Sequence, residues 1–464
     1  MAFRRSVGCA SFQRHLLDRR SFLRAGMLGT AGLSLANLLR AEDIAAAAGG
    51  KPSRVNSVII LWMRGGPSHI DTWDPKPDAP VEFRGEFGTM STTVPGIQLI
   101  DQLPLSAKIM DKWSIVRSLH HRSEDGLADH GSGDQICFTG YGSGPDPGVN
   151  INPSCGSIAA RELQHLNPEL PVYVMIPRNI PGTDSGYFGP AYKPFETGTA
   201  DPANAGPFKV PMFELPDGLS VERFNGRKAL LADLDTLRRK VETTASMGTM
   251  DKFRAQAWNI LSGTAARDAF DLDKEPQAVR ERYGFMPMFD PKDPKRCSAA
   301  AWSQRILLAR RLVEAGVRLV TVDLGWWDTH VKGFESLKLG FMARFDQAYT
   351  ALIQDLEERG MLASTLVLAW GEFGRTPKVN ADAGRDHYPQ AMSAAIAGGG
   401  IKGGRVIGST DSKGTGPKDN PKVPQDVLAT VYRHLGIDKH KIYVSPQGRP
   451  QAVLPAGEPI EELF

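Results

Sequence analysis

Metal-binding side chains follow three separate apolar runs of the sequence, each at the point where the run ends. The runs are 58–63 (VIILWM), 317–323 (VRLVTVD) and 365–370 (TLVLAW). Imidazole and carboxylate groups together suit divalent cations such as Zn, Mn, Mg or Ca. The pattern therefore predicts a site for one or two such cations. The candidate ligands are His69, Asp71, Asp328, His330, Glu372 and His387, with Asp74, Asp323 and Asp386 beside them.

Each of these residues has a simpler explanation when it is taken alone. The segment DTWDPKP is typical of an Asx turn fixed by two prolines, and Asp328 can cap a helix. Glu372 can pair with Arg375, and His387 can be a hydrogen-bonded loop histidine. Three strand ends with the same ligand chemistry nevertheless favour one shared site.

A fourth polar cluster lies between the first two runs, at 118–144. Its sequence is SLHHRSEDGLADHGSGDQICFTGYGSG, and its candidate catalytic residues are His130 and Ser132. The glycines around them would let backbone amides approach an anion at a helix N-terminus. A plain glycine-rich loop explains the same residues. The cluster also contains His120, His121 and Asp134.

The three apolar runs are interpreted as buried strands because each is short and is ended by turn residues. Continuous apolar strands, covered on both faces, are typical of a parallel sheet. Helical patterns lie at 303–315, 345–359 and 426–435. This alternation predicts an open, mostly parallel, doubly wound α/β sheet with helices on both faces. Ligands of such sheets bind beyond the carboxyl ends of the strands, where the candidate ligands lie.

The middle of the chain has a different composition. Residues 179–216 are rich in glycine, proline and aromatic side chains, and 219–264 are largely polar with a helical pattern. We interpret 179–300 as a loop-rich insertion that covers the site, within one domain spanning 49–464.

The first 48 residues match an export signal. The motif RRSFLR, at 19–24, is typical of a twin-arginine signal, and an apolar run and the tract AAAAGG follow it. An amphipathic surface helix is the simpler alternative. The apolar run is shorter than the ~20 residues that cross a bilayer as a helix, so no transmembrane anchor is expected in the mature form. We expect recognition by the twin-arginine export machinery and a periplasmic or secreted protein.

The charge argues against a nucleic-acid-binding protein, and the cysteine content argues against a disulfide framework and a soft-metal site. The formal charge is +3, but residues 1–48 carry seven arginines against three acidic residues, so the remainder has a net charge of −1. This balance argues against nucleic acid as a partner. Outside the signal, Cys137, Cys155 and Cys297 show no CxxC spacing, so neither a disulfide framework nor a soft-metal site is expected.

Several segments resemble the alkaline phosphatase and sulfatase superfamily. Residues 345–374 (FDQAYTALIQDLEERGMLASTLVLAWGEFG) are similar to its late helix and strand, which lead into a metal-binding acidic loop. DVLATVYRHLGI, at 426–437, is similar to its closing helix. The full set of motifs, from the twin-arginine signal through GGPSHIDTWDPKP, DTH, GEFGRTP and GRDHYP, most closely resembles domain-of-unknown-function family fifteen-hundred-and-one. This resemblance implies an alkaline-phosphatase-like fold.

The resemblance also implies metal ligands. Glu372 takes the place of a metal-binding Asp, and Phe373 replaces the Asn beside it. Asp328 in VTVDLGWWDTH matches a strand that supplies an Asp and a His to one metal, and His330 is that His. His387 falls where the superfamily has a late metal-binding or substrate-binding His.

The nucleophile motif departs from the superfamily. ICFTG resembles the end of the sulfatase motif, and counting back from Gly140 places His130 where sulfatases have a modified Cys. Asp134 stands where they have an Arg. No formylglycine can form, and a Ser or Thr nucleophile is absent unless Ser132 shifts into that position.

The leading hypothesis is an exported, metal-dependent hydrolase of phosphate or sulfate esters of small molecules or polysaccharides. Metal-activated water is the expected nucleophile, with His130 as a further ligand or a base. Arg64, Arg375 and Arg385 are the candidates to bind the anionic oxygens, because a guanidinium matches them with two N–H groups. The alternatives are a non-catalytic exported binding or surface protein on a sulfatase-like scaffold, and a transferase or mutase with the same fold.

Overall fold

The computed structural model describes residues 56–464 apart from 126–128, 167–169, 199 and most of 203–263, where only 208, 210, 223 and 226 are described. The predicted signal peptide at 1–48 and nearly all of the helical pattern at 219–264 lie outside the described residues.

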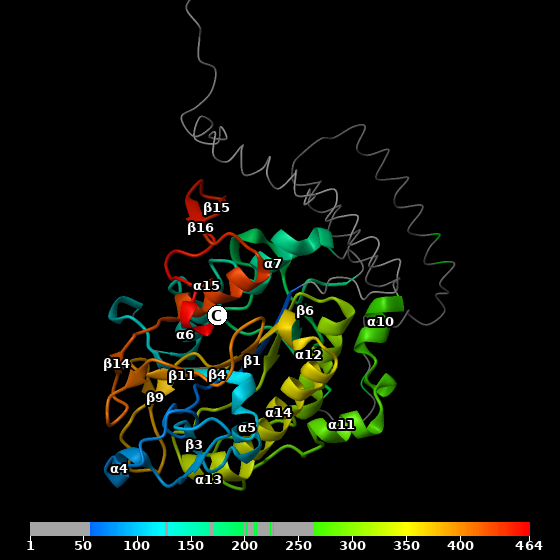
Figure 1. Ribbon diagram of the computed structural model, residues 1–464. Coiled ribbons are helices and arrows are strands. Elements are labelled where there is room, and N and C mark those ends of the chain that lie inside the picture. The colour runs from blue at the N-terminus through cyan, green and yellow to red at the C-terminus, as the bar shows by residue number, and fades with distance from the viewer. Residues whose placement is uncertain are drawn as a thin grey trace, which may run out of the picture. The chain divides into compact units, whose positions relative to one another are not determined.

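An eight-stranded sheet lies at the centre of the described residues (Figure 1). Its order is β12-β4-β11-β8-β1-β7-β5-β6. β11 is antiparallel to both of its neighbours, and the other pairs are parallel. The predicted mostly parallel sheet is therefore confirmed. The strands are β1 (Ser57–Trp62), β4 (Trp113–Leu119), β5 (Tyr173–Ile176), β6 (Phe195–Glu196), β7 (Leu319–Asp323), β8 (Thr365–Trp370), β11 (Met392–Gly398) and β12 (Val406–Ile407).

The three strands predicted from the apolar runs are β1, β7 and β8, and they are neighbours in the sheet. Trp62 at the end of β1 pairs with Asp323 of β7 on one side and with Trp370 of β8 on the other. Since the three strands are parallel and end in register, the loops that follow them start at one edge of the sheet.

Helices cover both faces of the sheet, as predicted (Figure 1). Ile59 and Leu61 of β1 belong to a core shared with α12 (Ser303–Ala315) and α14 (Met342–Glu358). Val58 and Ile60 point to the opposite core, shared with α6 (His130–Thr139), α7 (Cys155–Leu163) and α15 (Pro424–Leu435). The period of two along the strand thus divides its apolar side chains between two helical layers.

The remaining elements are short. β6 adds a strand to the edge of the sheet within 179–216, which was predicted as loops. None of the described helices is long and apolar enough to cross a membrane. The short elements include α4 (Val81–Arg84), α5 (Pro104–Ala107), α10 (Thr264–Phe270), α11 (Gln277–Tyr283), α13 (Gly333–Ser336), and the two-stranded pairs β2 (Thr89–Ser91) with β3 (Gln98–Ile100), β9 (Gly374–Arg375) with β10 (His387–Tyr388), β13 (Ser409–Thr410) with β14 (Pro417–Asp419) and β15 (Ile442–Val444) with β16 (Pro450–Ala452).

The buried position of Ile60 gives a stability prediction. Ile60→Ala should lower the free energy of unfolding by about 2–5 kcal/mol, because it leaves a cavity in the core between β1 and the helices. Ile442→Ala removes the same atoms from a side chain that is 62% exposed and should cost much less. Urea unfolding monitored by circular dichroism measures both values, and equal losses would argue against the core described above.

Candidate metal centre

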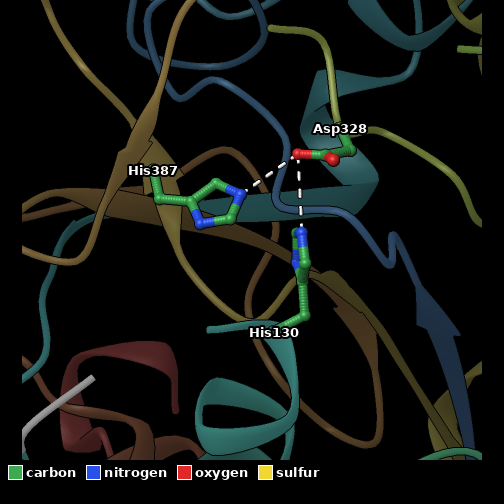
Figure 2. A group of neighbouring side chains, drawn as sticks. All are labelled: His130, Asp328 and His387. Carbon is green, nitrogen blue, oxygen red and sulfur yellow. Dashed lines mark hydrogen bonds and ion pairs between the residues drawn. The ribbon is translucent and has the colours of Figure 1, made fainter. Parts of the chain in front are cut away.

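Imidazole nitrogens of three histidines gather around one carboxylate oxygen, Oδ1 of Asp328. The Nε2 atoms of His330, His387 and His130 lie 3.0, 3.1 and 3.5 Å from it, respectively. The Nε2 atoms of His330 and His387 are 3.2 Å apart. Figure 2 shows His130 and His387 pointing toward this oxygen from two sides. The side chains of this group, the candidate metal centre, are partly exposed.

Three elements at one edge of the sheet supply these side chains. His130 is the first residue of α6, whose N-cap, Asp129, accepts the backbone N–H of Ser132. Asp328 and His330 lie in the loop that follows β7, and His387 lies in β10, which pairs with β9 just beyond β8. The parallel strands thus bring together residues that are up to 257 positions apart in the chain.

Two further carboxylates lie behind the histidines. Nδ1 of His130 is 2.5 Å from Oε1 of Glu372, and Nδ1 of His330 is 2.7 Å from Oδ1 of Asp386. A carboxylate accepts the Nδ1–H, which leaves Nε2 of the neutral ring with a lone pair facing the centre. This arrangement of carboxylate, histidine and centre is typical of metal sites, where the outer carboxylate fixes the ring and its tautomer.

The residues present fit a divalent cation. Lone pairs on neighbouring Nε2 atoms and on a carboxylate oxygen repel one another unless a proton or a cation lies between them. Ligands of a tetrahedral zinc at about 2.0–2.2 Å are separated by about 3.3–3.6 Å. The separations in the structure, 3.0–3.5 Å, lie at or slightly below this range. Ligand atoms of His130, Asp328 and His387 all lie within 4.8 Å of one another, and His330 lies beside them. Imidazoles together with a carboxylate suit Zn or Mn better than Mg or Ca.

The charges of the centre are strongly coupled. Burial works to raise the pKa of Asp328, but hydrogen bonds from the three histidines and the charge of Arg375 hold it well below its usual range. Burial lowers the pKa of His387. Burial also works to lower the pKa of His130, but its hydrogen bonds to Asp328 and Glu372 raise that pKa to about 9. Without a cation, an imidazolium at His130 therefore balances the two carboxylates.

Arg375 connects the loops beneath the centre. Its guanidinium is fully buried and donates to Oδ1 of Asp328 at 2.6 Å. It also donates to the carbonyl oxygens of Gly65, Gly66 and Arg385. These bonds join the segments that follow β1, β7 and β8, so the structure places Arg375 as a crosslink rather than as a free anion-binding group.

The structure does not bring His69, Asp71 and Arg385 into the group. His69 is completely buried, and its Nε2 lies 2.9 Å from the carbonyl oxygen of Gly414. Asp71 accepts two hydrogen bonds from Arg385, at 2.6 and 2.9 Å. The Asp71–Arg385 pair holds the loop after β1 against the segment that carries His387, and His69 holds the same loop against the segment around Gly414.

Ser132 and Arg64 also have partners of their own. Oγ of Ser132 donates to the N-cap Asp129 at 2.9 Å and lies 3.2 Å from Oγ of Ser143. Arg64 makes two hydrogen bonds to Asp323, at 3.2 and 2.9 Å. The predicted nucleophilic and anion-binding roles would require these bonds to break.

Two aromatic side chains that were not among the predicted site residues lie beside the histidine rings of the centre. The rings of Trp326 and Phe373 lie 4.5 and 5.1 Å from the ring of His130, and Phe373 lies 4.5 Å from that of His387. Both residues lie within the motifs that carry predicted ligands, WWDTH and GEFG, and this position in the sequence could have indicated them.

Residues 55–464 match the family described as "Protein of unknown function (DUF1501)". The chain belongs to this family. No curated protein shows significant sequence similarity to it.

Solved structures similar to this chain include three proteins of low sequence identity. The phosphonate monoester hydrolase SpPMH from Silicibacter pomeroyi is 11% identical, with 88% of this chain and 76% of that chain covered and a TM-score of 0.38. The PsFucS1 sulfatase from Pseudoalteromonas sp. is 12% identical, with coverages of 85% and 70% and a TM-score of 0.33. The lipoteichoic acid synthase LtaP from Listeria monocytogenes is 10% identical, with coverages of 82% and 72% and a TM-score of 0.31.

The carboxylates of Glu372 and Asp386, which bond to Nδ1 of His130 and His330, give a prediction for metal affinity. Glu372→Gln should weaken zinc binding by about 10–100-fold, because the amide no longer fixes the Nδ1–H tautomer of His130 as firmly. Asp386→Asn changes the matching partner of His330, but its side chain is 56% exposed and the loss should be smaller. Competition with a chromophoric chelator measures both affinities, and an unchanged affinity in Glu372→Gln would contradict the proposed orientation.

The raised pKa of His130 gives a prediction for the chelator-treated protein. The pKa of about 9 in the folded state exceeds the ordinary value of 6.5, so the stabilisation from protonated His130 is fully present below pH 6.5. It is lost as the pH rises to about 9, by at most about 3 kcal/mol. Thermal unfolding between pH 6 and 9.5 should show this loss in the wild type and a flatter profile in His130→Gln. An equal slope in both proteins would assign the loss to other groups.

Proposed function

We propose that this protein is a metal-dependent hydrolase of phosphate or sulfate esters. The observation that carries the proposal is the convergence of three imidazole nitrogens on Oδ1 of Asp328, with carboxylates behind two of the rings. A structural role alone does not require three imidazole rings to face one carboxylate oxygen. The motif resemblance to the alkaline phosphatase and sulfatase superfamily supplies the reaction class.

The roles of the residues follow from their contacts. His130, Asp328, His330 and His387 would hold one divalent cation, with Zn or Mn favoured by the donor set. When bound, such a cation acts as a Lewis acid and lowers the pKa of a coordinated water. Glu372 and Asp386 fix the rings of His130 and His330.

The surroundings of the centre would exclude part of the solvent. Trp326 and Phe373 lie against the ring of His130, so an ester that enters the centre loses water on that side. The pair of His330 and the exposed Asp386 faces solvent and gives a route by which a proton can leave. We include export by the twin-arginine route, to the periplasm or the outside of the cell, on the basis of the RRSFLR motif.

One observation favours a non-catalytic binding protein as the second candidate. His130 stands where the resembling sulfatases carry their nucleophile, and both of its ring nitrogens face carboxylates. With Nδ1 bonded to Glu372 and Nε2 used to hold the cation, His130 would have no lone pair left for attack, and turnover would depend on another nucleophile such as water. A binding protein would keep the metal and lack turnover.

Metal analysis combined with hydrolysis assays tests the proposal. We expect the purified protein to contain about one Zn or Mn per chain and to hydrolyse p-nitrophenyl sulfate, p-nitrophenyl phosphate or p-nitrophenyl phenylphosphonate. Asp328→Asn should lose the metal and at least about 100-fold in kcat/KM. The control is His440→Ala, which changes an exposed histidine after α15 and should keep both.

The outcomes separate the candidates. Stoichiometric metal without turnover of any of the three esters would favour the binding protein. A folded protein that takes up no metal would contradict both candidates. Equal effects of Asp328→Asn and His440→Ala would show that the candidate metal centre is not the functional site.

A further inference from the structure

One face of α6 packs directly on the main chain that follows β8. His130, Gly133 and Cys137 share this face, because residues three and four positions apart are neighbours on a helix. Nδ1 of His130 bonds to the side chain of Glu372, and the thiol of Cys137 lies 3.7 Å from the carbonyl oxygen of Glu372. Gly133 lies between these two contacts.

The contact leaves no room for a side chain at Gly133. A Cβ atom there would lie 2.9 Å from Cβ and 3.3 Å from Cγ of Glu372, and 3.1 Å from its carbonyl oxygen. Carbon atoms in contact prefer about 3.5–4.0 Å, so a methyl group would push α6 and Glu372 apart by roughly 0.6–1.1 Å at this point. Gly133 has an ordinary helical conformation, and alanine is the better helix former. The contact with Glu372, and not the helix backbone, therefore requires glycine.

Glu372 is held from other sides and cannot yield easily. The backbone N–H of Gly65 donates to its Oε1 at 2.7 Å, and Nε2 of His121 lies 2.6 Å from its carbonyl oxygen. Glu372 is completely buried, whereas the side chain of His130, the first residue of α6, is 21% exposed. A methyl group at position 133 should therefore displace the start of α6, and His130 with it.

We propose that Gly133 is a positioning residue of the candidate metal centre, because its lack of a side chain sets the distance between His130 and Glu372. The bond between Nδ1 of His130 and Oε1 of Glu372 is 2.5 Å long. A separation of the two segments would bring it to the long end of the hydrogen-bond range or beyond. The inference rests on the proposed function, since this bond orients the ring of His130 for the cation.

Zinc affinities test whether Gly133 acts through Glu372. Gly133→Ala should weaken zinc binding by about 10–100-fold, as expected when the outer partner of a ligand is disturbed. The same change made in Glu372→Gln should weaken binding by no more than about twofold further, because the bond is already altered. The control is Gly142→Ala, where an added Cβ would meet no described atom within 4 Å beyond its chain neighbours. Equal losses from Gly133→Ala in both backgrounds would overturn the inference.

Proton NMR of the chelator-treated protein gives a readout without metal. The proton of a hydrogen bond as short as 2.5 Å resonates far downfield, and its absence in His130→Gln assigns the signal. We expect this resonance in the wild type and in Gly142→Ala, and its loss or an upfield shift in Gly133→Ala. An unchanged resonance in a folded Gly133→Ala would overturn the inference.

A second variant keeps the inference testable if circular dichroism shows that Gly133→Ala does not fold. Cys137→Val crowds the same face of α6 against the carbonyl oxygens of Gly371 and Glu372, one turn further from His130. It should shift the resonance in the same direction by a smaller amount, and an unchanged resonance would then overturn the inference. A wild type that binds no zinc would defeat the proposed function, whereas the resonance of the metal-free protein would still decide the role of Gly133.

Discussion

The arrangement of the centre depends on one interaction, the approach of several imidazole nitrogens to a single oxygen of Asp328. Separations of 3.0–3.5 Å between these atoms are stable only when positive charge lies among them. The guanidinium of Arg375, which donates to the same oxygen at 2.6 Å, meets part of this requirement, and a proton on His130 or a divalent cation adds to it. The carboxylates of Glu372 and Asp386 favour protons on the outer nitrogens, an arrangement that would leave the inner nitrogens for the proposed metal.

The sheet makes this approach possible. β8, β1 and β7 are parallel and end in register at Trp370, Trp62 and Asp323, so the loops after them share one edge. Arg375 then ties the three loops together through buried hydrogen bonds. The chain can therefore place a histidine from α6, two residues after β7 and one from β10 around a common point. At the same edge, Arg64 after β1 bonds to Asp323 at the end of β7.

The sequence was informative where a local pattern determines the outcome. Continuous apolar runs predicted β1, β7 and β8, and the period of the apolar residues predicted α12, α14 and α15. The residues that follow the strands included Asp328, His330 and His387, and the fourth polar cluster supplied His130 as a candidate catalytic residue or further ligand. The sequence could not show that Asp71 prefers Arg385 as a partner, or that Glu372 bonds to His130 from behind. These outcomes depend on side-chain positions between segments that are distant in the chain, and residue type and spacing do not encode such positions locally.

X-ray absorption spectroscopy of the zinc-loaded protein tests the central claim most directly. The account predicts a first shell of three imidazole nitrogens and one carboxylate oxygen at about 2.0–2.2 Å, with the multiple scattering that is characteristic of histidine rings. Replacement of His387 by Ala should remove one imidazole from that shell. A first shell of oxygen atoms alone, or an unchanged shell in the His387→Ala variant, would contradict the account.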